Sequence, residues 1–178
     1  LQSLAHNLNR KNNNLHLFEF GKTYSTESPG KYVEEDHLAL FITGKKTAES
    51  WKQKQEPTDL FYVKGIIRLL FAQLGLQEPV YKLGKNQHME IFLEGSSQQQ
   101  VLVHIGLVNK KRLDRFDIRQ ETWYADICWN VCLEQSSKVK LAYIEVPRFP
   151  TMFRDLAFVV DKALPFEKIE AAVASLKI

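Results

Sequence analysis

Apolar residues recur at intervals of three and four positions in three parts of the chain, and each part is predicted to form a helix. The most regular part follows Pro57, Thr58 and Asp59, which supply a helix N-terminus, and it ends at Gly75. Gly65 in its middle costs about 1 kcal/mol relative to Ala, which predicts a close packing contact there. The apolar stripe is wide enough to lie on a sheet face and consists of Leu60, Val63, Ile66, Ile67, Leu70, Phe71 and Leu74.

The two other helical patterns lie near the ends of the chain. At the beginning, Leu1, Leu4, Ala5 and Leu8 share one helical face. Near the end, Pro165 occupies an early helical position, where its missing N–H costs little. The apolar positions that follow it are Phe166, Ile169, Ala172, Val173 and Leu176.

Two apolar runs near the start predict a pair of strands. Leu15 to Phe20 is expected to end at Gly21, and Asp36 to Thr43 is nearly continuous in apolar residues, as in an interior strand. The segment from Thr23 to Lys31 contains serine, proline and glycine and is expected to form a loop. The two strands could therefore pair antiparallel through that loop.

Further strand patterns follow along the chain, with one polar loop before them. The polar stretch from Lys45 to Gln55 surrounds Trp51, whose indole is expected to fold back on the core. This order of elements predicts an α+β fold, with a mainly antiparallel sheet flanked by helices. The expected strands are Val80–Leu83, Met89–Leu93, Gln99–Leu107, Trp123–Trp129 and Lys140–Ile144, with a turn at Glu94–Ser97 and a turn or short helix at Val131–Gln135.

The last part of the chain reads as the opening of a second domain. Pro147 and Pro150 exclude a helix or a central strand, which predicts a linker over residues 147–150 after a first domain of residues 1–146. Leu156 to Val160 is a short apolar run typical of a buried strand. One strand and one helix cannot bury an apolar face by themselves, so residues 151–178 are expected to be the truncated start of a domain.

Composition narrows the class of protein. The 178 residues suffice for one core of ordinary size, and no apolar run approaches the roughly 20 residues of a membrane span. The net charge of +3 permits contact with nucleic acid without demanding it. Neither a secretory signal pattern nor an initiator Met stands at the start, and both ends are expected to be cut from something longer.

Several kinds of catalytic or metal site find little support. The glycines include no Gly-x-Gly, so neither a dinucleotide fingerprint nor a P-loop can be written. The five histidines lack metal-ligand spacing, and Cys128 and Cys132 are expected to be buried or free thiols in a reducing cytoplasm. The acidic run Glu34 to Asp36 is expected to be a solvated turn. Arg154 and Asp155 are expected to form an ion pair or cap at the start of the second domain, rather than a catalytic site.

A basic segment carries the strongest chemical signal. Five cations within ten residues could follow a phosphate backbone. Asp114, Asp117 and Glu121 lie among them and are expected to pair off part of the charge at helical spacing. Two readings stay open, contact with nucleic acid and a solvated or subunit-facing surface. The candidate RNA-binding residues are Lys110, Lys111, Arg112, Arg115 and Arg119.

Several segments together resemble the C-terminal half of bacterial phenylalanyl-tRNA synthetase β subunits. The specific ones are Asp59-Leu60-Phe61-Tyr62-Val63-Lys64-Gly65, and Phe149-Pro150 followed by Arg154-Asp155-Leu156-Ala157. Leu17-Phe18-Glu19-Phe20-Gly21, Leu40-Phe41-Ile42-Thr43-Gly44 and Ile105-Gly106 occur in the same order. The resemblance covers nearly the whole chain and implies a class II aminoacyl-tRNA synthetase-like module that has lost its active site. It also implies that a ferredoxin-like anticodon-binding domain begins at about Thr151.

The resemblance also implies the partners. In that family a catalytic α subunit makes phenylalanyl-adenylate from ATP and transfers phenylalanine to tRNA-Phe, and the β module packs against it in a cytoplasmic α2β2 assembly. ATP and Mg²⁺ are accordingly expected for the holoenzyme, and no catalytic residue, cofactor, metal or membrane contact is expected on this fragment. Two rivals remain, a free-standing RNA-binding module that uses the Lys110 to Arg119 segment and an active class II-like ligase.

Overall fold

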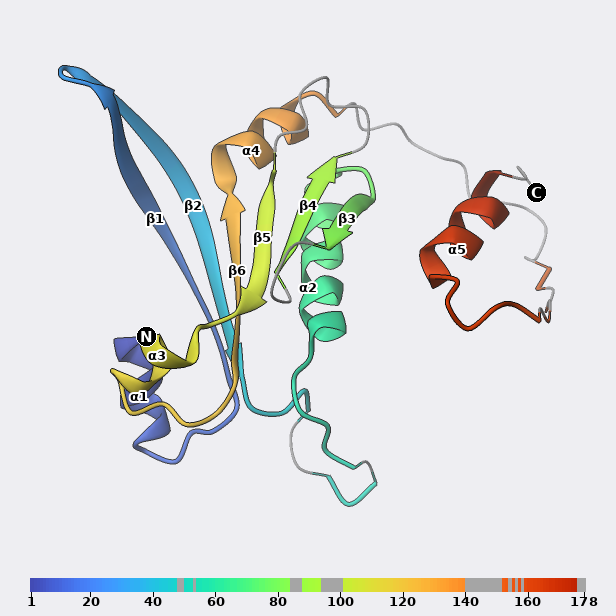
Figure 1. Cartoon of the computed structure of the whole chain (residues 1–178), viewed down its shortest axis with the longest axis horizontal. Coiled ribbons are helices and arrows are strands. Elements are labelled where there is room, and N and C mark those ends of the chain that lie inside the picture. Colours follow the sequence, from blue (N-terminus) through green and yellow to red (C-terminus); the bar gives the residue numbers. More distant parts are fainter. Residues whose placement is uncertain are drawn as a thin grey trace. The chain divides into compact units, whose positions relative to one another are not determined.

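The computed structural model describes residues 1–47, 50–52, 54–83, 88–93, 101–139, 152–153, 155, 157 and 159–175. The chain divides into two compact units, Leu1–Leu141 and Ala142–Ile178. The sheet belongs to the first unit and helix α5 to the second (Figure 1). The predicted turn at residues 94–97, the predicted strand at residues 140–144 and the linker at residues 147–150 lie outside the described residues.

The first unit is built on a six-stranded sheet with the order β1-β2-β6-β5-β4-β3 (Figure 1). Every pair of neighbouring strands is antiparallel. β2 is therefore interior, as its continuous apolar run predicted, while β1 forms one edge of the sheet. The strands are β1 (Leu15–Ser28), β2 (Lys31–Thr43), β3 (Pro79–Leu83), β4 (Met89–Leu93), β5 (Val103–Leu107) and β6 (Thr122–Cys128).

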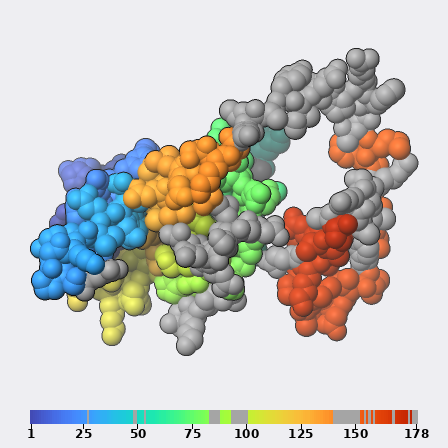
Figure 2. Space-filling model, turned by 90° about the horizontal axis from the view of Figure 1, so that it is seen from above, coloured from blue at the N-terminus to red at the C-terminus, as the bar shows by residue number. Residues whose placement is uncertain are grey.

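The β1–β2 hairpin is much longer than the sequence indicated. β1 does not stop at Gly21, and the expected loop from Thr23 to Lys31 is wrong, because the strands continue to a tight turn in which Gly30 has φ 87°. Since β6 pairs with β2 only from His37 to Thr43, the residues Gly21–Asp36 form a two-stranded arm beyond the sheet. The acidic run Glu34–Asp36 accordingly lies in a solvated strand and not in a turn. In Figure 2 the arm (light blue) lies beside α4 (orange).

Helix α2 (Leu60–Gln73) confirms the prediction from apolar spacing. Asp59 caps it by accepting a hydrogen bond of 2.8 Å from the Tyr62 N–H, and the Lys46 ammonium lies 2.7 Å from the same carboxylate. The close contact expected at Gly65 is wrong, because a Cβ added there would meet nothing within 4 Å. The helix instead packs on the sheet through Val63, Ile67 and Phe71.

The two faces of the sheet differ in what covers them. On the covered face, α2 and α4 (Trp129–Ser137) pack over a core that contains Ile105 and Ile127. On the other, here called the open face, α1 (Gln2–Leu8) and α3 (Lys110–Asp114) cover only one end, where Leu4 and Leu113 form a second cluster with Leu15. Beyond them the middle of the open face is polar, and Val80 and Phe92 add apolar side chains toward its far edge. One row of paired positions across it reads Glu19, Ala39, Asp126, His104, Glu90 and Lys82.

Two tryptophans show where a loop meets the core. The indole of Trp51 is 98% exposed, so the prediction that it folds back on the core is wrong. Trp123 on β6 takes that place and donates a hydrogen bond of 3.2 Å from its indole N–H to the Thr58 carbonyl oxygen. That bond ties the loop before α2 to an interior strand, so Trp51 is not needed as an anchor.

The second unit is described in part. Helix α5 (Phe166–Ser175) confirms the pattern that follows Pro165. The strand predicted at residues 156–160 is not formed by Ala157, Val159 or Val160, the residues of that range that are described, and Val159 is fully exposed. A strand needs a hydrogen-bonded neighbour, and the described part of this unit contains none. No helix within the described ranges is long and apolar enough to cross a membrane.

Candidate functional site

The basic segment lies on α3 and the loop that follows it, at the end of the open face. The Asn109 side chain caps this helix by accepting a hydrogen bond of 2.9 Å from the Lys111 N–H. Leu113 and Ile118 are buried in the second cluster, which fixes the segment on the sheet. Asp117 has φ 53° and turns the chain toward β6. The four cations on the helix and at its end therefore face solvent: Lys110, Lys111, Arg112 and Arg115.

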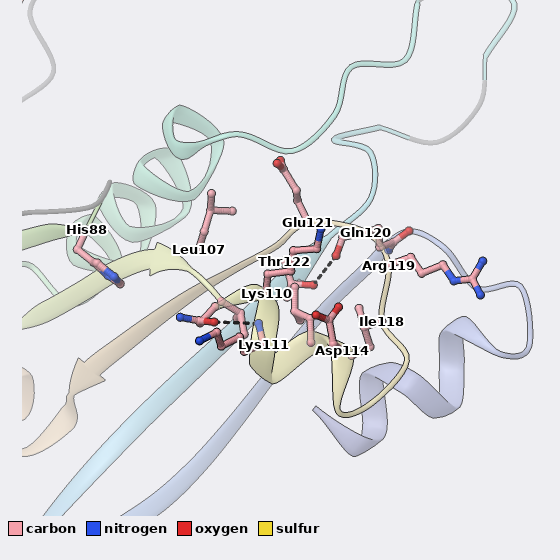
Figure 3. A pocket seen from close by; sticks show the side chains of 13 residues that line it. His88, Leu107, Lys110, Lys111, Asp114, Ile118, Arg119, Gln120, Glu121 and Thr122 are labelled. Atoms are coloured by element: carbon pink, nitrogen blue, oxygen red, sulfur yellow. Dashed lines mark hydrogen bonds between the residues drawn. The ribbon is translucent and has the colours of Figure 1, made fainter.

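The structure brings three of the five predicted cations to one hollow, shown in Figure 3. Lys110, Lys111 and Arg119 line this open hollow of about 930 Å³, although Figure 3 shows the Arg119 side chain extending away from it. Arg112 lines a neighbouring hollow of about 540 Å³. Arg115 is exposed outside both. The cations therefore form a broad surface and do not converge on one point.

Among the described residues, little of this charge is neutralised by carboxylates. The expected pairing at helical spacing is wrong, because α3 ends at Asp114 and the only carboxylate near a cation of the segment, among the described residues, is Asp117. Its Oδ1 lies 3.9 Å from Arg119 Nε, and both side chains are exposed. An exposed ion pair with this separation contributes little to stability. The segment therefore presents positive charge that a polyanion could bind.

His88 and Tyr124 form a polar contact that the sequence did not reveal. The Tyr124 hydroxyl is hydrogen-bonded to His88 Nδ1 at 3.2 Å, and both residues line the smaller hollow. Burial raises the pKa of the Tyr124 hydroxyl, and the charge of Asp126 adds to that shift while Arg112 opposes it. The imidazole lies over Gly106, where a Cβ would collide with the ring and come within 3.1 Å of Tyr124 Cε1. The glycine in a strand was the available signal.

Replacing Gly106 with Ala should therefore displace the His88 ring and break its hydrogen bond to Tyr124. We expect the free energy of unfolding to fall by about 1 kcal/mol, the usual net value of such a bond. Urea titration of the variant checks this. Gly21→Ala is the matched control, because Gly21 also lies in a strand but has nothing within 4 Å of an added Cβ. Equal effects of the two changes would contradict the role of His88.

A second polar cluster links three strands on the open face. His37 Nδ1 donates to Asp126 Oδ1 at 2.7 Å, and His37 Nε2 is hydrogen-bonded to the Thr23 hydroxyl at 3.1 Å. Hydroxyl, imidazole and carboxylate stand in the order of a hydrolase triad. Thr23 is exposed on the arm, however, and the Asp126 side chain is 43% exposed, so the described residues do not enclose the cluster as a substrate pocket would. The cluster connects β1, β2 and β6.

The remaining candidates are possible metal ligands, the two thiols and the residues predicted at the start of the second domain. Within the described ranges, no group of three or more His, Cys, Asp or Glu side chains could hold a metal ion. Cys128 and Cys132 are free thiols, as predicted. Burial raises the pKa of the Cys132 thiol to about 12, which keeps it protonated and unreactive. Of the residues predicted at the start of the second domain, Asp155 is exposed, and Pro147, Phe149, Pro150 and Arg154 lie outside the described part.

Comparison of the fold with solved structures finds pyrrolysyl-tRNA synthetase from Desulfitobacterium hafniense. One such structure matches with a TM-score of 0.53 at 12% identity and covers 74% of this chain and 45% of that one. A second, of the pyrrolysyl-tRNA synthetase PylSc of the same organism, has a TM-score of 0.52 at 15% identity. These neighbours share the predicted antiparallel sheet with flanking helices, so that part of the predicted fold class is confirmed.

Sequence comparison identifies the family. The model of the phenylalanyl tRNA synthetase beta chain CLM domain matches residues 1–129. The chain is 37% identical to the phenylalanine–tRNA ligase β subunit of Bacteroides thetaiotaomicron and 33% identical to that of Porphyromonas gingivalis, over 96% of its length in both cases. It spans 22% of the length of each of these proteins. This chain therefore belongs to the phenylalanyl-tRNA synthetase β chain family, as its motifs predicted.

Proposed function

We propose that this chain is a non-catalytic module of a phenylalanine–tRNA ligase β subunit, which packs against the catalytic α subunit in a cytoplasmic α2β2 assembly. The observation that carries the proposal is the identity of 33% and 37% to named β subunits over nearly the whole chain. In this assembly the α subunit would use ATP and Mg²⁺ to attach phenylalanine to tRNA-Phe. The β module would contribute protein–protein packing.

The chemistry of the open face supports a non-catalytic role. An enzyme that activates an amino acid with ATP needs cations placed against the phosphates. The row of paired residues across the middle of this face contains three carboxylates, from Glu19, Asp126 and Glu90, and Lys82 at the far edge. A triphosphate lying there would be repelled. The cations of the basic segment gather instead around α3, at the end of the sheet.

The proposal includes two domains joined by a linker. Residues 1–146 would form the class II-like module, residues 147–150 the linker, and residues 151–178 the start of a ferredoxin-like anticodon-binding domain. The exposed apolar side chains of α5, Phe166 and Val173 among them, support the last assignment, because an amphipathic helix buries such residues against further elements of its domain. Pro147, Phe149, Pro150, Arg154 and Asp155 would set the direction of the chain between the two.

Co-purification tests this function. The chain would be expressed together with the α subunit of Bacteroides thetaiotaomicron, whose β subunit is 37% identical to it. We expect a stable complex, and we expect the chain alone to support no phenylalanine-dependent exchange of pyrophosphate into ATP. The absence of a complex would refute the packing role. Exchange by the chain alone would refute the non-catalytic one.

We also propose that the basic segment gives weak support to tRNA within that complex. Replacing Lys110, Lys111 and Arg115 with Ala should reduce the salt slope of tRNA binding by about one for each phosphate contact that these side chains make. The matched control replaces Lys31, Lys52 and Lys54, three exposed lysines elsewhere in the first unit. Filter binding at several salt concentrations distinguishes the two sets. An unchanged salt slope in the first set would refute contact between the basic segment and tRNA, and the segment would then be a solvated or subunit-facing surface.

The rival reading as a free-standing RNA-binding module receives no support from the comparisons, since the named relatives are ligase subunits. Steep, salt-dependent binding of tRNA by the chain without an α subunit would be its signature.

A further inference from the structure

The exposed aromatic side chains of β1 and of the arm lie on one face only. Phe18, Phe20, Tyr24 and Tyr32 all point to the side of the sheet on which α2 lies, because each occupies an even-numbered position of the paired register. They are between 55% and 76% exposed. Phe20 contacts Trp129 of α4, with ring centroids 5.1 Å apart, so the stripe begins at the core and continues outward along the arm. An exposed aromatic stripe of this kind marks an interaction surface.

The outer edge of β1 is unpaired as well, as far as the described residues go. β1 is the edge strand of the sheet, is 14 residues long and contains no proline. Natural proteins blunt such edges with prolines, bulges and charges. Here the only register shift falls at the tip, between Thr26 and Ser28, and Lys22 is the one lysine or arginine along the strand. The backbone N–H and C=O groups of the outer edge can therefore accept another strand.

The two ends of the β1–β2 hairpin differ in net charge. The arm holds two lysines against three glutamates and one aspartate, a net charge of −2. At the opposite end of β1 lie α1 and α3 (Figure 1), where Arg10, Lys11 and the cations of the basic segment gather. An acidic arm with aromatic residues is a poor surface for nucleic acid. It complements the basic end of another copy of the same chain.

We propose that two copies of this chain pair antiparallel through the outer edges of β1, so that each arm lies against the basic end of the other. The contact is isologous, as a two-fold axis requires. It needs only this chain and is therefore independent of the catalytic partner, although an α2β2 assembly would supply two copies. Antiparallel pairing joins the two sheets and satisfies the open backbone groups of both edges.

The side chains favour one register. If the two-fold axis passes at Gly21, Phe18 stands opposite Tyr24 of the second copy, and Phe20 stands opposite Lys22. Aromatic pairs and a cation against an aromatic ring are both favourable across strands. No like charges meet in this register.

Sedimentation velocity of the chain alone tests the pairing. We expect a dimer of twice the 20.7 kDa chain mass, which dissociates as salt is raised. F18E should weaken dimerisation about 30-fold, which corresponds to about 2 kcal/mol, because the Phe18–Tyr24 pair that it breaks occurs twice in the dimer. Y24K should act similarly. The double variant F18E/Y24K places opposite charges at both positions and should restore the dimer.

The matched control is F61E, which makes the same change at an exposed phenylalanine on α2, away from the arm. It should dimerise like the parent chain. Circular dichroism of each variant verifies folding, and recovery in the double variant cannot arise from misfolding. A monomer at all concentrations would overturn the proposal, as would a dimer that F18E leaves intact or that F61E breaks. None of these outcomes bears on complex formation with an α subunit, so the two proposals fail separately.

Discussion

Replacing Ile105 with Asn should lower the free energy of unfolding of the first unit by on the order of 5 kcal/mol. Ile105 is fully buried on β5, between Met89 of β4 and Ala125 of β6, and its side chain faces α2. The change removes apolar packing and places an amide where its surroundings are apolar. Both effects act in the same direction, because an unpaired buried amide loses its hydrogen bonds to water. Since domains of this size have about 5–15 kcal/mol in all, much of the protein should unfold.

The neighbouring position supplies the control. His104→Asn introduces the same side chain one residue earlier on β5, where it is exposed on the open face, and should change stability by no more than about 0.5 kcal/mol. Urea unfolding followed by tryptophan fluorescence measures both variants. Similar losses in the two would show that β5 does not separate a buried face from an open one.

The elements that bury an apolar face could be predicted from the sequence. The stripe of α2 and the alternation in β5 reflect periods that the core imposes, 3.6 residues for a helix and 2 for a strand. The helix boundary was also readable, because Asp59 supplies a cap whose chemistry is local. The register and order of the strands needed the structure, since these depend on contacts between residues far apart along the chain.

The arm shows where pattern reading fails. Residues Gly21 to Asp36 form regular strands, but most of their side chains are polar and solvated on both faces. Two tyrosines on one face are too weak a pattern to mark a strand, so the composition resembles a loop. The glycines gave a similar error. Gly65 was expected to lie in close contact with a neighbouring element, but nothing lies within 4 Å of a Cβ added there. Gly106 instead lies under the His88 ring. Which glycine is crowded depends on what the fold brings near it.

The positive charge of the candidate site could be predicted from the sequence, but its shape could not. Five cations in sequence predicted a basic surface, and the structure places three of them on one hollow. The contribution of His88 was not foreseeable, because it lies 36 residues from its partner Tyr124 and meets it only through the alignment of β4, β5 and β6. Sequence spacing also failed for the ion pairs, since it assumed a helix longer than α3.

Phe71→Ala is the second change for which we expect a large effect, a loss of about 3–5 kcal/mol in the free energy of unfolding. Phe71 lies in the last part of α2, is 1% exposed and belongs to the core between this helix and the sheet. Truncation leaves a cavity that β-strands cannot close, because their spacing is fixed by backbone hydrogen bonds.

A second phenylalanine on the same helix makes this test specific. Phe61 lies in the first turn of α2 and is 76% exposed. Phe61→Ala therefore deletes the same atoms as Phe71→Ala, but from a side chain in solvent and not from the core. Alanine also has the higher helix propensity, and this control should therefore be neutral or slightly stabilising. Thermal unfolding of both variants gives the comparison. If the two lowered the midpoint equally, α2 would not present to the sheet the face that contains Val63, Ile67 and Phe71, and the division into a covered and an open face would be wrong.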